Sequence, residues 1–480
     1  MFVGRAANLF AIRLVRDPGQ PTRVVLVDAA GTPLGGDDEV AAWCRTTDDP
    51  GRAGAVEVLP RPLRTPAKVL IAGLGDGDYR AAGAAAVAAV PGDEEIQIVV
   101  PEGATEAQVR DLAEGAWFAG YRFREAPAGP RTAAVDLVTT HDGYAAALDE
   151  ARAVAEAVWL ARDLTNMPSS TKNPAWFAGQ VVASAATRPG LEVIVREPEQ
   201  LAEEGFGGIL AVGGASATPP RLVEVRWAPS GAVRHVVLVG KGITFDTGGI
   251  SIKTRDGMKL MKKDMGGAAS VVAATLAAAD LDLPVRVTAL VPLAENAVGG
   301  DAYRPGDVIT HYDGTTSEST NSDAEGRLVL ADALGYAVSR LEPDVVIDLA
   351  TLTGANAVAL GKGMAAMYTH DDDLAAALLA AGEDAGEGMW RMPLPDDYVE
   401  YLRSDIADRH SSPAQGGGSV VAALYLREFL GDKADNWAHF DMSAPSWSDR
   451  TEGALVKGAT GWGVRTLVRY LQALTTDGDE

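Results

Sequence analysis

Three short stretches of this chain place charged side chains beside glycines and apolar runs. They are KGITFDTGGISIK at 241–253, MKKDMGG at 261–267 and NSDAEGRL at 321–328, and together they carry four carboxylates. Neighbouring runs such as HVVLVG and VVIDLATLTG are apolar enough to be core strands. These charged side chains are therefore expected to be buried and to need a counterion.

Length and composition set the class of protein. A chain of 480 residues exceeds what one hydrophobic core usually serves, so two domains are expected. The net charge of −24 should repel nucleic acid and anionic lipid, so neither is an expected partner. The single cysteine, Cys44, is expected to be a packed thiol in a reducing compartment. With no signal peptide or membrane span recognised, a cytoplasmic location is expected.

Apolar strands alternate with helical patterns along the whole chain, which predicts an α/β fold with two α/β domains. We expect an N-terminal α/β domain at residues 1–143, a linker helix at 144–166 and a C-terminal domain at 167–480. The near-continuous apolar strands of the second domain predict a mixed, mostly parallel sheet with helices on both faces. The helices expected in this domain lie at 258–279, 327–339, 374–381 and 420–430.

The first two charged stretches supply candidate ligands. The strand RHVVLVG delivers Lys241 at its carboxyl end, where sites of open α/β sheets usually lie. Asp246 and Lys253 follow in a glycine-rich loop, which could wrap an ion or could be a solvated turn. Asp264 lies at helical spacing from apolar residues, which predicts the inward face of a helix. The alternative is a carboxylate turned to solvent near the helix start.

The third stretch points to metal ions. If NSDAEGRL is extended, Asp323 and Glu325 point to the same side, and Arg327 joins them as the next helix begins. Two carboxylates held together repel unless a cation lies between them. An ion pair between Arg327 and Glu325 at the helix start is the alternative. Apart from the Lys241 amine the candidate ligands are oxygens, which favours Mn²⁺ or Mg²⁺ and allows Zn²⁺. The three stretches together are typical of a two-metal hydrolytic site.

Other reactive residue types are expected to be structural. The six histidines are dispersed without an HxxxH array, which excludes a zincin site. The stretch AGLGDGD at 72–78 lacks the third glycine of a dinucleotide fingerprint and is expected to be a turn. GGASAT around Ser216 lacks the second glycine of a nucleophile elbow. QGGGS at 415–419 is expected to be a loop before a helix.

Beyond this reading of the residues, the stretches KGITFDTGGISIK, MKKDMGGAAS, NSDAEGRLVLADAL and DLATLTGA resemble the leucyl aminopeptidase family of cytosolic metallopeptidases. Ser322 stands where that family usually has threonine. SDIADRH, WAHFDMSAPSW and GATGWGVRTL extend the similarity to about residue 466, and RDLTNMPSS extends it toward the N-terminus. The N-terminal domain resembles the family only loosely.

The resemblance implies a role for each matching residue. Lys253 and Arg327 would be the catalytic cations, and Arg327 could hold a bicarbonate. Met261, Thr351 and Gly354 would line the pocket for the substrate side chain. Five residues would bind two divalent ions, Mn²⁺ or Zn²⁺: Lys241, Asp246, Asp264, Asp323 and Glu325.

The implied reaction is hydrolysis of the first peptide bond by a metal-bridged hydroxide, with Lys253 stabilising the oxyanion. The implied substrates are short peptides with a free N-terminus, leucine or a similar apolar residue being preferred, and the implied assembly is a homohexamer. Ser443, Pro445 and Ser446 make one late loop more polar than is usual in the family. Two alternatives stay open, a DNA-binding regulatory member of the family and a two-metal phosphoesterase.

Overall fold

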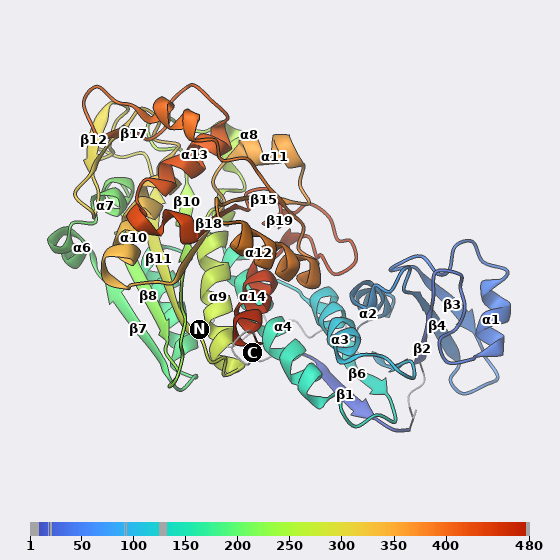
Figure 1. Ribbon diagram of the computed structural model, residues 1–480. Helices are drawn as coiled ribbons and strands as arrows, with labels where there is room; N and C mark the ends of the chain where they lie inside the picture. The colour runs from blue at the N-terminus through green and yellow to red at the C-terminus, as the bar shows by residue number, and fades with distance from the viewer. Residues whose placement is uncertain are drawn as a thin grey trace. The chain divides into compact units, whose positions relative to one another are not determined.

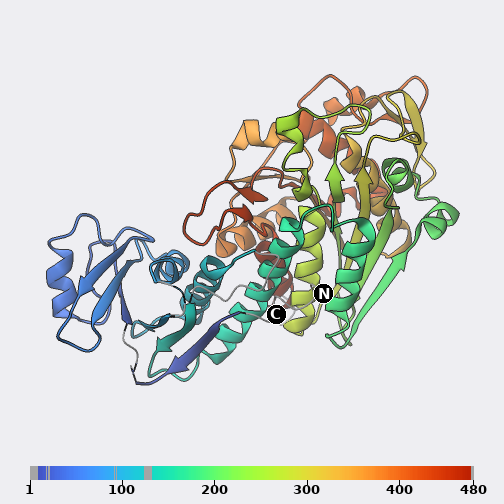
Figure 2. The ribbon, with the colours of Figure 1, turned by 180° about the vertical axis from the view of Figure 1, so that it is seen from behind.

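The computed structural model describes residues 9–17, 19, 22–90, 92, 94–123 and 132–476, which Figures 1 and 2 show from opposite sides. The chain divides into two compact units. The smaller unit contains the described residues up to Trp159 together with Ser448–Gly458. The larger unit contains Leu160–Trp447 and the described residues from Ala459 onward. The boundary falls within the long helix α4, Ala145–Asn166.

The smaller unit is built on a six-stranded sheet with the order β1-β6-β5-β2-β4-β3. Neighbouring strands are parallel except β3 and β4. Helices α2 and α3 pack closely, and Gly115 permits this because it has no side chain: a Cβ there would lie 2.0 Å from the Arg80 carbonyl oxygen. Cys44 is buried in an apolar cluster, as predicted. The elements are β1 Ala11–Val15, β2 Thr22–Val27, α1 Asp38–Cys44, β3 Val56–Pro60, β4 Lys68–Gly73, α2 Tyr79–Ala88, β5 Glu94–Val99, α3 Glu106–Gly120 and β6 Thr132–Val138.

The larger unit contains a nine-stranded sheet, in which β10 pairs with β11 beside the main path β16-β15-β18-β14-β9-β11-β8-β7. Its centre, β18-β14-β9-β11, is parallel, and antiparallel pairs lie toward the edges. The predicted mixed, mostly parallel sheet is therefore confirmed. Its strands are β7 Leu191–Arg196, β8 Arg221–Trp227, β9 His235–Gly240, β10 Gly242–Asp246, β11 Arg286–Asn296, β14 Val345–Ala350, β15 Ala365–Tyr368, β16 Met389–Arg391 and β18 Trp437–Asp441. The short strands are β12 Asp307–Thr310, β13 Thr316–Ser319, β17 Arg409–His410, β19 Trp447–Ser448 and β20 Gly458–Ala459.

Helices cover both faces of this sheet. On one face, Val237 and Val239 of β9 pack into the same apolar cluster as Leu328 of α10. Successive strand residues point to opposite faces, so Gly240 faces the other side of the sheet. A Cβ on Gly240 would lie 2.6 Å from Ala268 Cα, so α9 covers that side. The helices are α5 Pro174–Ala185, α6 Pro198–Glu204, α7 Gly207–Gly213, α8 Arg255–Met258, α9 Gly266–Asp280, α10 Glu325–Arg340, α11 Gly354–Leu360, α12 Asp372–Ala385, α13 Gly418–Arg427 and α14 Val464–Thr476, with 3₁₀ turns η2 Met261–Lys263, η3 Asp396–Leu402 and η4 Gly431–Asn436.

The continuous helix predicted over 258–279 is wrong. The segment contains α8, η2 and α9, and Asp264 lies between η2 and α9. Within this break Asp264 turns inward and its Oδ2 lies 2.9 Å from the Lys241 Nζ. A Cβ on Gly267 would lie 2.0 Å from the Leu349 carbonyl oxygen, so α9 begins tightly against β14. The alternative of a solvent-facing Asp264 is also wrong, since this residue is only 4% exposed.

Charged and polar residues gather where parallel strands of the larger unit end. Lys241 follows β9 directly, Asp246 ends β10, Asn296 ends β11 and Asp441 ends β18. Carboxyl ends of parallel strands meet at one edge of a sheet, which is where ligands bind in open α/β folds. The predicted loop before α13 is present at residues 411–417. Among the described residues, no helix combines the length and the apolarity that a membrane crossing requires.

Candidate metal centre

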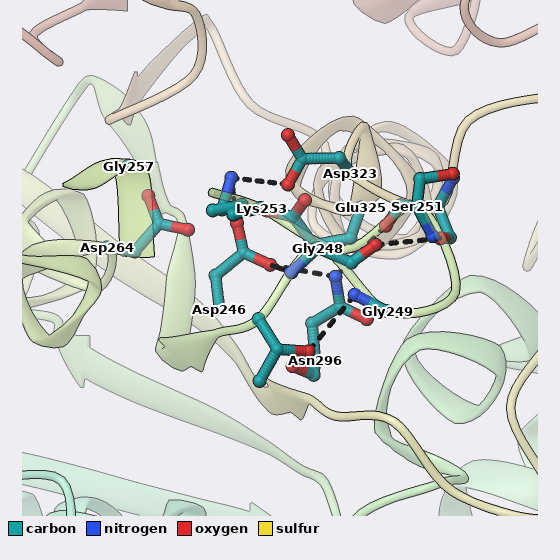
Figure 3. Close-up of polar contacts among 12 residues, drawn as sticks. Asp246, Gly248, Gly249, Ser251, Lys253, Gly257, Asp264, Asn296, Asp323 and Glu325 are labelled. Atoms are coloured by element: carbon teal, nitrogen blue, oxygen red, sulfur yellow. Dashed lines mark hydrogen bonds and ion pairs between the residues drawn. The ribbon is translucent and has the colours of Figure 1, made fainter. Parts of the chain in front are cut away.

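Three carboxylates converge at this edge of the sheet. One oxygen from each of Asp246, Asp323 and Glu325 lies within 4.8 Å of the others, and Figure 3 shows them around the Lys253 ammonium group. The prediction that an extended NSDAEGRL brings Asp323 and Glu325 together is wrong. Asp323 lies in a turn and Glu325 is the first residue of α10, so the bend of the chain brings the two side chains together.

Lys241 and Asp264 extend the cluster on its other side. The Lys241 Nζ lies 2.9 Å from Asp264 Oδ2 and 2.8 Å from Glu325 Oε1, and all three side chains are almost fully buried. The Lys241 Nζ also donates to the Thr351 carbonyl oxygen at 3.0 Å, and the Thr351 hydroxyl donates to Asp264 Oδ1 at 2.7 Å. Thr351 thereby fixes the positions of both partners.

Lys253 neutralises the opposite side. Its Nζ lies 2.7 Å from Asp246 Oδ2 and also contacts Asp323 Oδ1. Burial alone would lower the pKa of Lys253, but Asp246 and Glu325 outweigh burial and raise this pKa. The same balance holds at Lys241. Burial lowers its pKa, but the facing carboxylates of Asp264 and Glu325 have the larger combined effect, so the pKa of Lys241 is raised. The two lysines therefore act as counter-charges to four carboxylates.

The acidic groups respond to the same crowding. Burial, followed by the nearby Glu325 carboxylate, raises the pKa of Asp246 to about 6. Burial also raises the pKa of Glu325 despite the opposing charge of Lys241. Burial is the main cause of both shifts, so an ionised carboxylate at either position needs a nearby positive charge.

Two loops are joined to hold this geometry. The Ser322 hydroxyl donates to the Gly248 carbonyl oxygen at 2.7 Å and accepts from the Ser251 amide at 2.7 Å. Gly248 has φ +87°, and a Cβ there would lie 2.9 Å from Asp323 Oδ1. The Gly248 amide donates to Asp246 Oδ1 at 2.8 Å. Replacement of the family's threonine by Ser322 thus preserves the hydroxyl that connects the two loops.

The first turn of α10 also has a close approach. A Cβ on Gly326 would lie 2.5 Å from the Lys241 Cε and 2.6 Å from its Nζ. Any larger residue would therefore displace Lys241 from Glu325. The glycine of the sequence AEGRL is required by this contact between a lysine and a helix backbone.

Arg327 lies two residues farther along α10 but does not pair with Glu325, so the alternative of a helix-capping ion pair is wrong. Its Nη1 donates to the Ser411 carbonyl oxygen at 2.6 Å. The guanidinium is buried, which lowers the pKa of Arg327, and its Nε makes no hydrogen bond with any described residue. A buried guanidinium whose Nε–H makes no hydrogen bond with a described residue is suited to bind a small anion.

The cluster lines a pocket of about 220 Å³. Met261, Thr351 and Gly354 all line this pocket, so the three residues predicted to bind substrate lie beside the five predicted metal ligands. Arg327 is not among the lining residues. The remaining lining residues are Leu352, Thr353, Ala357, Lys263 and Ser443.

Several residues that shape the site were missed from the sequence. The Asn296 Nδ2 donates to Asp246 Oδ1 at 2.8 Å and to the Ser322 carbonyl oxygen at 3.0 Å. Asp441 accepts from the amides of Leu352 and Thr353 at 3.2 and 3.0 Å and so fixes the loop after β14. A signal was present for both, since each is a polar residue that ends an apolar strand.

The donor set fits divalent cations. The Glu325 Oε2 is buried and accepts no hydrogen bond from the described residues. Four carboxylates and two lysines leave the cluster net negative, which one or more cations would correct. Hard oxygen ligands suit Mn²⁺ or Mg²⁺ and also Zn²⁺.

Comparisons with known proteins agree with this chemistry. Residues 159–468 match the model of the cytosol aminopeptidase family, catalytic domain. A probable cytosol aminopeptidase of Streptomyces avermitilis is 40% identical over 99% of this chain and 97% of the relative. One of Corynebacterium glutamicum is 41% identical over 88% of this chain and 86% of the relative. Among solved structures, the bottromycin maturation enzyme BotP in complex with Mn is 40% identical with a TM-score of 0.85, over 95% of this chain and 99% of that one. Cytosol aminopeptidase from Coxiella burnetii is 32% identical with a TM-score of 0.84, and the match covers 97% of this chain and 99% of that one.

Proposed function

The chain belongs to the cytosol aminopeptidase family and is therefore a metal-dependent aminopeptidase, and we propose that it removes leucine or a similar apolar residue from the N-terminus of short peptides. The observation that carries the proposal is the convergence of Asp246, Asp323 and Glu325 within 4.8 Å, beside a pocket large enough for a side chain.

We assign the metal centre to Lys241, Asp246, Asp264, Asp323 and Glu325, which would together hold two divalent ions, Mn²⁺ or Zn²⁺. BotP, at 40% identity, is described in complex with Mn, which supports this assignment. Lys241 would bind as a neutral amine, because a dication can displace its proton. When bound, the ions would acidify a water and accept the free α-amine of the peptide.

The chain's own cations complete the chemistry. Lys253 lines the pocket together with its partners Asp246 and Asp323, and we assign it to donate a hydrogen bond to the oxygen of the peptide carbonyl. The same charge would then stabilise the oxyanion as the carbonyl carbon is attacked. Arg327 presents a buried Nε–H that makes no hydrogen bond with a described residue, and we assign it to bicarbonate, which would take up the proton of the attacking water.

Recognition of a free amine gives the sharpest test of the reaction. We expect leucine 4-nitroanilide to be hydrolysed and its N-acetylated counterpart to be inert, because acetylation removes the lone pair that a metal ion would bind. Hydrolysis of both compounds at similar rates would contradict the proposed exopeptidase. Cleavage of 4-nitrophenyl phosphate in place of the anilide would identify the alternative phosphoesterase. The net charge of −24 does not favour the DNA-binding alternative.

We further propose a homohexamer in the cytoplasm. Ile252 and Val358 are 64% and 89% exposed and lie in the chain next to pocket residues, so an assembly would bury apolar surface near the site. Light scattering at micromolar concentration should give about six times the subunit mass of 49.9 kDa. A mass equal to that of one subunit would contradict the assembly.

A further inference from the structure

A fully buried lysine contacts the segment that carries Asp264. Lys172 lies in the loop after α4 and is 0% exposed, although lysine is rarely buried without a charged partner. All its hydrogen bonds to described residues go to uncharged acceptors. The Nζ donates to the Thr165 carbonyl oxygen at 3.0 Å, to the Lys262 carbonyl oxygen at 2.5 Å and to the Met265 sulfur at 2.9 Å. Burial of an amine is unfavourable unless its hydrogen bonds are satisfied, so these contacts hold the side chain in place.

The contact between the two segments is reciprocal. Lys262 accepts at its carbonyl oxygen from Lys172, and its own Nζ donates to the Asn166 carbonyl oxygen at 2.8 Å. Two lysines therefore join the end of α4 and the following loop to the turn η2, in opposite directions, and we call these contacts the lysine clasp. The end of α4 is itself fixed, because the Asn166 Oδ1 accepts from the Ala459 amide at 3.1 Å.

The turn held by the lysine clasp carries two residues of the site. Met261 begins η2 and lines the pocket, and Asp264 follows η2 directly and lies 2.9 Å from the Lys241 Nζ. Within the turn, the Asp264 amide donates to the Met261 carbonyl oxygen at 3.2 Å. A 3₁₀ turn of three residues has few internal hydrogen bonds, so its position depends on contacts from outside.

The same loop also contacts the strand that ends in Asp246. The Ser169 hydroxyl donates to the Thr244 carbonyl oxygen of β10 at 2.9 Å, and Asp246 is the last residue of this strand. One short loop thus contacts both ligand-bearing segments, because Lys172 reaches the segment of Asp264. A shift of the loop would change the separation of two carboxylates that are assigned to the metal centre.

The lysine clasp does not require a charged Lys172. Burial lowers the pKa of Lys172 well below its usual value, and the nearby Lys262 charge lowers it further. An uncharged amine keeps two N–H bonds, which are enough for the carbonyl oxygens of Thr165 and Lys262. A methionine has a similar length but no donor, so Lys172→Met would remove this hydrogen bond from both oxygens.

We propose that Lys172 and Lys262 are positioning residues, which hold η2 where Asp264 can bind a metal ion and Met261 can contact the side chain of the substrate. The inference rests on the proposed metal centre and adds two residues that act on it without being ligands. Loss of either lysine should weaken the metal site that contains Asp264.

Calorimetric titration of Mn²⁺ into the chelated protein measures the effect on the metal centre. The unaltered protein should bind two ions. Lys172→Met should raise the dissociation constant of one of them by at least about 10-fold, the lower end of what contacts behind a metal ligand contribute. Equal dissociation constants in the two proteins would overturn the proposal. If the unaltered protein binds no Mn²⁺, the proposed metal centre is wrong and the inference falls with it.

A matched control separates positioning from general support of the fold. Arg196 on the edge strand β7 pairs with Glu204 at 2.8 Å and with Glu224 at 2.9 Å. Arg196→Met should lower the melting temperature but leave both dissociation constants for Mn²⁺ unchanged. A loss of metal affinity as large as that of Lys172→Met would show that the effect comes from lower stability, and the proposal would be wrong.

Kinetics with leucine 4-nitroanilide at saturating Mn²⁺ report on the substrate side of the turn. Lys172→Met should raise KM more than it lowers kcat, because Met261 is displaced while Lys253 keeps its partners. The Arg196→Met control should leave KM unchanged. A fall in kcat with an unchanged KM in Lys172→Met would contradict the role given to Met261.

Lys262→Met tests the other half of the lysine clasp at a partly exposed position. It should weaken the same ion as Lys172→Met. The double variant should lose less affinity than the two single effects multiplied together, because either substitution alone already breaks the clasp. Single effects that multiply would contradict a shared clasp. Unchanged binding of both ions in Lys262→Met would overturn the proposal, also where Lys172→Met fails to fold.

Discussion

Replacing Lys253 by alanine is expected to lower kcat by about 10²- to 10³-fold, the usual effect of removing one oxyanion donor. The two metal ions should remain bound, because Lys253 contacts the carboxylates and is not assigned as a ligand. Its Nζ lies 2.7 Å from Asp246 Oδ2, so the variant also loses a counter-charge. The bound ions would supply that charge in the loaded enzyme, and its melting temperature should change little. Steady-state kinetics, elemental metal analysis and a melting curve on the same sample check all three statements.

Replacing Asp264 by alanine is the contrasting variant. This residue is 4% exposed, pairs with Lys241 and is assigned as a metal ligand. Removing it should weaken the binding of one ion, so metal content should fall together with activity. A Lys253→Ala protein depleted of metal beside an Asp264→Ala protein with full occupancy would show that the two roles are assigned the wrong way round.

The second large effect is expected from chelation. Removing the ions should abolish peptidase activity and lower the free energy of unfolding by about 2.7 kcal/mol for each site that was held at about 100 times its dissociation constant. A clear fall in melting temperature should follow. Full activity after exhaustive chelation, with an unchanged melting curve, would contradict a metal centre at this position.

The structure explains why chelation need not unfold the chain. Lys241 and Lys253 lie between the carboxylates at contact distance, so part of the negative charge is compensated by the protein itself. The larger unit also keeps its apolar cluster around α10 and the central strands, which does not depend on the ions. We therefore expect a folded, inactive protein after chelation, recoverable when Mn²⁺ is returned.

Much of the fold is evident from the sequence because its strands are short, apolar and bounded by glycine or charge. The runs HVVLVG and VVIDLA predict buried parallel strands, and they form β9 and β14 at the centre of the sheet. The helix over 258–279 was mispredicted for a physical reason. Periodicity reports which side chains are apolar, but it does not report that the chain leaves the helix between α8 and α9, where Asp264 pairs with the buried Lys241.

At the candidate site, too, the sequence predicts some features and does not predict others. Charge and spacing indicated the carboxylates, because such residues are rare beside core strands. The bend that brings Asp323 to Glu325 was not evident, since a residue spacing of two fits an extended strand equally well. Asn296 and Asp441 were missed because their role is to hold other residues, through contacts 50 and 88–89 positions away in the chain.

The most direct test of the two-metal account is a titration of Mn²⁺ into chelated protein while the release of leucine from a peptide with a free N-terminus is measured. The account predicts no release without metal and a rise that reaches its plateau at two ions per chain. The Glu325→Gln protein should fail to reach this plateau, because one of the five assigned ligands is replaced by an uncharged amide. Full activity of the chelated protein, or a plateau that Glu325→Gln reaches as readily as the unaltered chain, would contradict the central claim.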